Sequence, residues 1–374
     1  MAKRKLTDSI SAVHPGEILK NLLVSKEMSQ KELAAAIGKS TPVVNDLLSG
    51  KRDINVEIAI LLETVFELPQ AEEWLQYQSS YDLEKTRQSE KVMELQKAIT
   101  NWKSLDEVIN LRVIKKRAGL GASVVNDLDF LYKLYNVEDA DALRISLSQT
   151  RNTACFKKSE ALQNDERNIN TWILLTRISD AKRLLETKFN LNCVQSLISR
   201  LNDVFYRNLN VLREVESILR DFGIKFIVEK KLEKVPVDGY SFWQGENPTI
   251  VVTTRSSLLD NLAFTIYHEL GHIILHLSKD RNIDFLDVIE GAKKSAQEIE
   301  ANEFASKSIW KNFDFYSLFA KIQQPFGATP ILKRLSEKLH IHEGIIAGQY
   351  QHYLEDIKHP TPYAVCSKLK VKFQ

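Results

Sequence analysis

Residues 267–276 read Tyr-His-Glu-Leu-Gly-His-Ile-Ile-Leu-His. On an α-helix, His268 and His272 are separated by about 40° of rotation and 6 Å of rise, so both imidazoles can reach one Zn²⁺ ion. Glu269 follows the first histidine and can take a proton from a metal-bound water. Apolar residues surround this pattern from Leu262 to Leu275, which predicts a buried helix. Buried histidine and glutamate side chains need polar partners, and a metal ion with its water supplies them.

The third ligand cannot be identified from spacing alone. His276 lies about 12 Å along the helix axis from His268, so we expect it to have a structural role. A carboxylate from a downstream helix that opens at Ser295 is the alternative. Glu298 could complete a capping box with Ser295, and Glu303 points away from the apolar stripe of that helix. Helix geometry therefore leaves Glu298 and Glu300 both possible.

The first 85 residues predict several short helices that form a helix-turn-helix. Ser29 and Glu32 form a capping box, Gly38 ends that helix, and Pro42 stands in the first turn of the next. The N-terminus of this second helix would face DNA, with base edges read from the major groove. The expected DNA-binding residues are the outward-facing and basic ones, namely Gln30, Lys39, Thr41, Pro42, Asn45, Lys51 and Arg52.

Downstream of this segment, helical periodicity dominates until about residue 221. Alternation typical of strands then appears at 223–228, 238–243 and 249–254, with turn residues between Gly245 and Pro248. We therefore expect an α+β fold that is mainly α. Its parts would be an all-α domain over 1–85, a helical connector over 86–210, and a domain with a small sheet over 211–374.

Composition limits the class of protein. The chain has 374 residues, of which 27% are charged and 44% hydrophobic, and no apolar run approaches the roughly 18 residues that cross a bilayer. No secretory signal follows the basic N-terminus, and Cys155, Cys193 and Cys366 are too far apart for a disulfide framework. We expect a cytoplasmic protein with no membrane partner. Residues 1–52 carry nine basic against five acidic residues, whereas 53–84 carry eight acidic and no basic ones.

The N-terminal segments 13–20, 28–34, 47–54 and 73–83 resemble the HigA-type antitoxins of the XRE helix-turn-helix family. The resemblance covers about residues 10–85. It implies an all-α module that binds double-stranded operator DNA, usually as a homodimer on a palindromic site.

The C-terminal part resembles the ImmA/IrrE family of zinc metallopeptidases, which have a zincin-like fold. The matching motifs are Phe-Thr-x-x-His-Glu-x-x-His at 264–272 and Glu-Ala-Asn-x-Phe-Ala at 300–305. The resemblance implies His268, His272 and Glu300 as Zn²⁺ ligands and Glu269 as general base. Residues 154–159 and 171–173 resemble the helical region that precedes this domain in XRE–ImmA/IrrE fusions. Residues 306–310 depart from the family pattern.

Two functional hypotheses follow. In the first, a DNA-binding regulator or antitoxin carries a zinc peptidase domain that hydrolyses a protein partner or itself, with Glu269 passing the proton to the leaving amine. In the second, the zinc domain is a non-catalytic scaffold that binds a toxin or senses a signal. The retained Glu269 favours the first. A donor that stabilises the oxyanion is also needed. The candidates are Tyr240, His342 and His352, and we do not choose among them.

Overall fold

The computed structural model describes residues 13–153, 165–288, 295–311, 313–322, 328–359, 366 and 369–374. The chain divides into two compact units, Met1–Thr100 and Asn101–Gln374, which we describe separately. The three-part division at residues 85 and 210 stays a prediction. Cys193 and Cys366 are free thiols, and Cys155 lies outside the described residues. Within the described part of the chain, no helix has the length and apolar character needed to span a bilayer.

The N-terminal unit is built from helices whose ends are set by local sequence signals. His14 caps the first helix and Ser29 forms the expected capping box with Glu32. Gly38 has φ +64° in the turn, a conformation that glycine adopts without strain. The helices are α1 (Pro15–Ser25), α2 (Gln30–Ala36), α3 (Thr41–Leu48), α4 (Val56–Phe66) and α5 (Ala71–Arg87).

One apolar core holds these helices together. Val44 and Leu47 of α3 are fully buried, as is Trp74 of α5. The start of α1 lies close against the end of α3, since a Cβ on Gly16 would lie 3.0 Å from the carbonyl oxygen of Leu48 and nearer still to that of Leu47. This position therefore requires glycine.

A helical stretch follows. It comprises α6 (Glu90–Ser104), α7 (Leu111–Ala118), α8 (Val124–Tyr135), α9 (Ala140–Thr153), α10 (Glu166–Ala181), α11 (Val194–Arg207) and α12 (Val211–Asp221), with 3₁₀ turns at Leu105–Glu107 and Leu191–Cys193. The helical character expected here is confirmed. Helix α6 runs across the division at Thr100.

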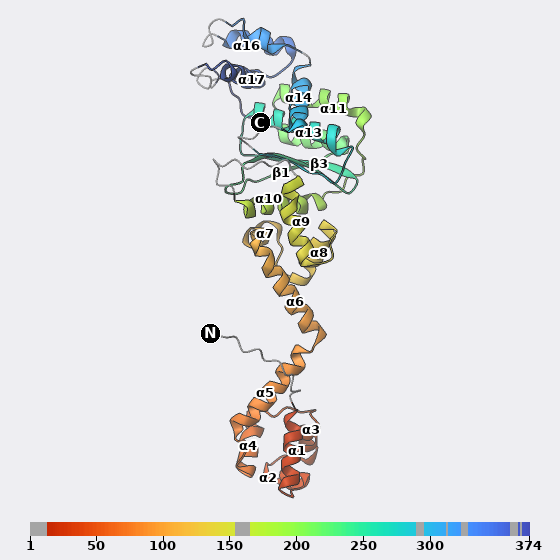
Figure 1. Ribbon diagram of the computed structural model, residues 1–374, viewed down its shortest axis with the longest axis vertical. Helices are drawn as coiled ribbons and strands as arrows, with labels where there is room; N and C mark the ends of the chain where they lie inside the picture. Colours follow the sequence, from red (N-terminus) through yellow and green to blue (C-terminus); the bar gives the residue numbers. More distant parts are fainter. Residues whose placement is uncertain are drawn as a thin grey trace. The chain divides into compact units, whose positions relative to one another are not determined.

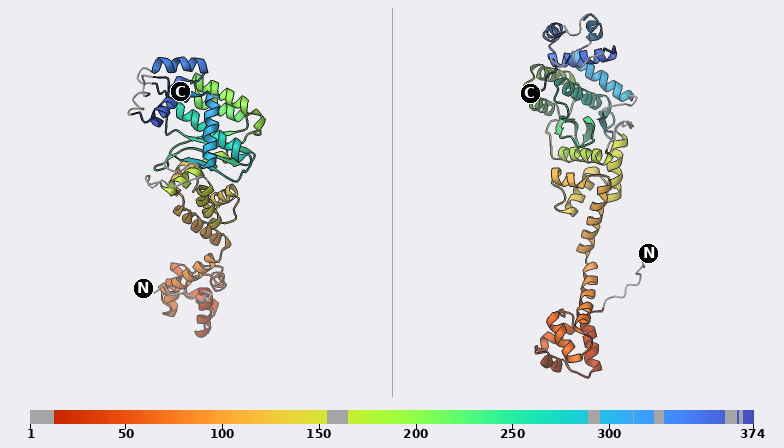
Figure 2. Two further views of the ribbon diagram at one scale, coloured as in Figure 1. Left: turned by 45° about the horizontal axis from the view of Figure 1, so that its top comes forward. Right: turned by 90° about the vertical axis from the view of Figure 1, so that its left-hand side faces the viewer.

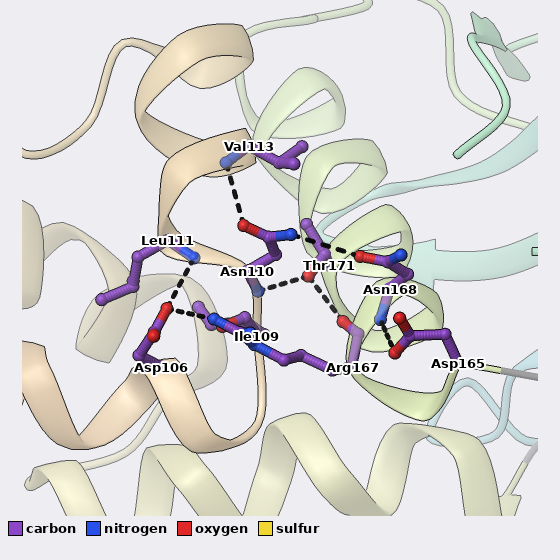
Figure 3. A network of polar contacts seen from close by, with 9 residues as sticks. All are labelled: Asp106, Ile109, Asn110, Leu111, Val113, Asp165, Arg167, Asn168 and Thr171. Carbon is purple, nitrogen blue, oxygen red and sulfur yellow. Dashed lines mark hydrogen bonds and ion pairs between the residues drawn. The ribbon is translucent and has the colours of Figure 1, made fainter. Parts of the chain in front are cut away.

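The turn that precedes α7 is fastened to α10 by side-chain and backbone hydrogen bonds (Figure 3). The backbone N–H of Asn110 donates to Thr171 Oγ1 at 2.7 Å, and Arg167 Nε donates to the Ile109 carbonyl oxygen at 2.9 Å. Arg167 also pairs with Asp106. These contacts fix the position of α7 relative to α10, which itself packs on the sheet.

The sheet has four strands in the order β1-β3-β2-β4, namely β1 (Lys225–Glu229), β3 (Asn247–Thr253), β2 (Val237–Gln244) and β4 (Phe285–Val288). Strands β1 and β3 are parallel, whereas β2 pairs antiparallel with β3 and with β4. The three strands expected from alternation are present. Strand β4, at the edge, was not expected.

Helices cover both faces of this sheet (Figures 1 and 2). Ile169, Trp172 and Ile173 of α10 pack against one face, together with Tyr240 and Phe242 of β2. Residues of α11, α12 and α13 pack against the other face, where Ile250 of β3 also points. The chain is mainly helical with a small mixed sheet, as expected.

The remaining elements build on the second face of the sheet. They are α13 (Leu259–His272), a π-helical turn (Ile273–Leu277), α14 (Ala296–Trp310), α15 (Phe315–Phe319), α16 (Thr329–Leu339) and α17 (Glu343–Asp356). The last residues return to the start of α13, where the Leu259 N–H donates to the Val371 carbonyl oxygen at 2.9 Å.

Candidate metal centre and DNA interface

The two histidines of the His-Glu-x-x-His pattern lie side by side on α13, as the spacing predicts. His268 Nε2 and His272 Nε2 are 3.0 Å apart, and both side chains are buried. The other ring nitrogen of His268 contacts Asn302 Oδ1 of α14 at 3.2 Å, while the His272 ring stacks on Phe285 of β4 with centroids 4.0 Å apart. Both imidazoles are thus fixed by neighbouring elements with their Nε2 atoms converging.

Glu298 of α14 completes this set. One carboxylate oxygen is 3.3 Å from His268 Nε2 and the other is 3.3 Å from His272 Nε2. Two ligands bound at 2.0–2.1 Å to a tetrahedral zinc lie roughly 3.3 Å apart. His268, His272 and Glu298 are therefore spaced to hold one divalent cation, and a fourth position would stay free for water.

Glu300, which the family resemblance implied as the third ligand, is not in this set. Its side chain is 62% exposed and its Oε2 lies 3.3 Å from His276 Nε2. The reason is the rotation of α14. Ser295 caps the helix by accepting from the Glu298 N–H at 3.2 Å, and this directs Glu298 at α13. Glu300, two residues and about 3 Å of rise further along α14, lies beside His276 instead. In this geometry Glu298, and not Glu300, lies with the two histidines.

Glu269 is fully buried, and neither carboxylate oxygen makes a hydrogen bond of ordinary geometry to the described residues. Burial raises the pKa of Glu269 well above its usual value, although the nearby His268 lowers it and Asp287 raises it further. Glycine at position 239 of β2 gives the carboxylate its space, because a Cβ there would lie 2.8 Å from Glu269 Cδ. The side chain is therefore held near the histidines in a form that readily takes a proton.

Asp287 is a site residue that the sequence did not indicate. One of its carboxylate oxygens lies within 4.8 Å of ligand atoms of His268 and Glu269. It comes from β4, whose four residues are too few for a recognisable alternation. Only the pairing of β4 with β2 brings it to the site.

The charges of the metal-free site are coupled. Burial lowers the pKa of His268, but the contact with Glu298 and the charges of Glu269 and Asp287 outweigh it and raise the pKa to about 9. Burial lowers the pKa of His272 to about 4. For Glu298, burial raises the pKa, and contacts with both histidines lower it below its usual range. A proton on His268 thus occupies the place that a cation would take.

The three candidates for an oxyanion donor have other contacts. Tyr240 is fully buried on the opposite face of the sheet, where its hydroxyl donates to Asp284 Oδ2 at 2.9 Å. His342 caps α17 by accepting from the Gly344 N–H at 3.0 Å. His352 is exposed on α17, with Nδ1 3.3 Å from Glu355.

The expected DNA-binding residues occupy the start of α2, the turn between α2 and α3, the first five residues of α3 and the loop after α3. Gln30, Pro42, Asn45, Lys51 and Arg52 are exposed, while Lys39 and Thr41 are half-buried. Lys39 Nζ forms an ion pair with Glu57 Oε1 at 2.6 Å, so its charge is already partly neutralised.

Gln78 of α5 holds the loop that carries the two basic residues, a role that no local pattern in the sequence indicates. Its Oε1 accepts from the Ile54 N–H at 3.0 Å, and its amide nitrogen donates to Asp53 at 3.3 Å and Asp82 at 3.1 Å. The buried amide thus fixes the backbone directly after Lys51 and Arg52.

Comparison with protein families gives two matches. Residues 19–69 match the helix-turn-helix family HTH_3, and residues 219–325 match Peptidase_M78, the IrrE N-terminal-like domain. A search of curated proteins gave no match.

Several solved structures are similar to part of this chain. Pseudomonas aeruginosa antitoxin HigA, solved with the higBA promoter, is 31% identical; the match covers 26% of this chain and 96% of HigA, with a TM-score of 0.20. P. aeruginosa PA4674, solved with its 28-bp operator DNA, is 37% identical over 20% of this chain and 81% of that one, with a TM-score of 0.19. A putative antidote protein of a Nostoc punctiforme plasmid maintenance system is 29% identical over 23% and 94%, with a TM-score of 0.22.

Proposed function

We propose that this chain is a DNA-binding regulator or antitoxin with a zinc-dependent peptidase domain, because its residues 19–69 match a helix-turn-helix family and its residues 219–325 match the IrrE N-terminal-like domain. The peptidase domain would hydrolyse a protein partner or the chain itself. The observation that carries the proposal is the fully buried Glu269 carboxylate beside His268, which itself lies with His272 and Glu298 in a possible metal site. A purely structural metal site has no use for such a base.

The donor set of two imidazoles and one carboxylate suits Zn²⁺ with an open coordination position. When bound there, zinc would lower the pKa of a water molecule and polarise the scissile carbonyl. Glu269 would take the proton of that water at its carboxylate and deliver it to the departing amine nitrogen. Its burial keeps competing water away, and its raised pKa suits a group that must hold a proton between these two steps.

In the DNA-binding half, α3 would enter the major groove with Thr41, Pro42 and Asn45 near base edges. An asparagine can bond an adenine edge twice, so Asn45 would contribute sequence preference. Lys51, Arg52 and Gln30 would contact phosphates, and a homodimer would match a palindromic operator. Lys39 would have to leave Glu57 before contributing to phosphate binding. We place the protein in the cytoplasm, where operator DNA is accessible.

Co-expression with the proteins encoded next to it tests the peptidase half. Wild type is expected to convert one neighbour, or itself, into defined fragments that mass spectrometry identifies, whereas Glu269→Gln leaves them intact. Glu303→Gln, an exposed change on α14, is the matched control and should behave as wild type. Identical fragment patterns for wild type and Glu269→Gln would contradict catalysis. They would favour the non-catalytic antitoxin whose zinc domain binds a toxin.

The DNA half has its own test. The full chain should shift a fragment of its own promoter at low salt, and the affinity should fall steeply as salt rises. Asn45→Ala should relax preference at one base pair and leave binding to other sequences unchanged. Absence of any shift at low salt would contradict the regulator function.

A further inference from the structure

A third imidazole continues the row of His268 and His272. The His276 side chain is only 4% exposed, and neither ring nitrogen makes a hydrogen bond of ordinary geometry with the described residues. Its ring centroid lies 5.3 Å from that of His272. An imidazole so deeply buried needs a partner for its nitrogens. The metal centre described above does not use His276.

A local change of helix type puts His276 in this row. Residues Ile273–Leu277 form a π-helical turn, in which the Ser278 N–H donates to the Ile273 carbonyl oxygen at 2.9 Å, five residues back. An α-helix would rotate His276 about 40° further around the axis from His272. A π turn rotates less per residue, so the third imidazole stays near the side of the helix that faces α14. Such turns often occur at functional sites.

Glu300 of α14 faces this imidazole. Its Oε2 is 3.3 Å from His276 Nε2, the same separation that Glu298 keeps from the inner histidines. A direct charge-assisted hydrogen bond between such groups is about 2.7–2.9 Å long. Two ligands of one tetrahedral cation lie roughly 3.3 Å apart. The separation of His276 Nε2 and Glu300 Oε2 therefore also suits two ligands of one cation.

We propose that His276 and Glu300 form a second, outer site for a divalent transition-metal ion of the Zn²⁺ or Co²⁺ class. The nitrogen and oxygen donors suit such ions, and calcium or magnesium would prefer oxygen alone. Glu300 is 62% exposed, so water completes the coordination. With two protein ligands against three, the outer site binds more weakly than the inner one. This inference rests on the proposed function for the class of metal ion. The outer site itself uses different residues from the inner site.

Cobalt titration of the metal-free full chain tests this inference, with bound metal counted by elemental analysis and coordination followed by visible absorption. Wild type is expected to bind a tight and a weaker equivalent. Glu300→Gln and His276→Asn should weaken the second by on the order of 10–100-fold and leave the first unchanged. Glu303→Gln, an exposed change three residues along the same helix, should behave as wild type.

Glu298→Gln separates the two sites, because it should remove the tight equivalent and keep the weaker one. If wild type binds only the weaker equivalent, the proposed function is overturned and the outer site stands. The outer site is overturned if wild type binds only the tight equivalent, or if the Glu300→Gln titration superimposes on that of wild type. Because Glu300 is exposed, Glu300→Gln avoids the folding defect that a change at buried His276 could introduce.

Discussion

Replacing Gly239 with alanine should separate catalysis from metal binding. The new Cβ would lie 2.8 Å from Glu269 Cδ and 2.9 Å from Cγ, and closer to Oε1. Ordinary van der Waals contact begins near 3.4 Å, so the carboxylate must withdraw by roughly 1 Å. Since Glu269 is fully buried, its neighbours must move with it, at a cost of about 1–3 kcal/mol in the free energy of unfolding.

A displacement of about 1 Å in a catalytic group can lower a rate by about 10²-fold. We therefore expect Gly239→Ala to cleave its substrate about 10²-fold more slowly than wild type in the co-expression assay, while retaining the tight metal equivalent. The three heavy atoms nearest to the added Cβ all belong to Glu269, and none belongs to a ligand side chain.

Gly245→Ala is the matched control. It has open space around its Cβ but φ +67°, so alanine there costs about 1–2 kcal/mol without reaching the site. Denaturant unfolding would show that both variants lose stability, whereas only Gly239→Ala should lose cleavage. If Gly239→Ala cleaved as fast as Gly245→Ala, the placement of Glu269 as general base against β2 would be refuted.

Three further predictions concern other parts of the chain. Gln78→Ala should lower the free energy of unfolding by about 1–3 kcal/mol, because it leaves the buried backbone N–H of Ile54 without an acceptor. The same variant should weaken operator binding in mobility shifts. Gln76→Ala, a change at an exposed position of the same helix, should have neither effect. Lys51→Ala and Arg52→Ala should each weaken binding on all DNA sequences alike and reduce the salt slope by about 1, and an unchanged slope would remove them from the interface. Metal binding at pH 7 should release about one proton, because the pKa of His268 is raised to about 9 in the metal-free site and its imidazole must be neutral to bind the metal. Calorimetry in buffers of different protonation heat measures the number of protons released. This number should fall towards zero above pH 9.

Features that depend on neighbouring residues could be predicted from the sequence. The His268 and His272 pair follows from the periodicity of a single helix, and the ends of α1, α2 and α3 follow from their caps. The strands of the β2–β3 hairpin also contain their own signals, alternation and a turn at Gly245.

Features that depend on how distant segments meet could not be predicted. The rotation of α14 against α13 selects Glu298 over Glu300, and no local pattern records that rotation. Asp287 reaches the site only through the pairing of β4 with β2, and Gln78 reaches the α3–α4 loop only through the packing of α5. The π turn at Ile273 is likewise invisible in the spacing of the three histidines.

The most direct test of whether His268, His272 and Glu298 hold one ion is zinc retention after brief exposure to a dilute chelator. Retention is measured side by side for wild type, Glu298→Gln and Glu300→Gln. The geometry predicts about one tightly held zinc per chain in wild type and in Glu300→Gln, and almost none in Glu298→Gln. Retention by Glu298→Gln together with loss by Glu300→Gln would contradict the assigned ligand set, and absence of zinc from all three would contradict the metal centre itself.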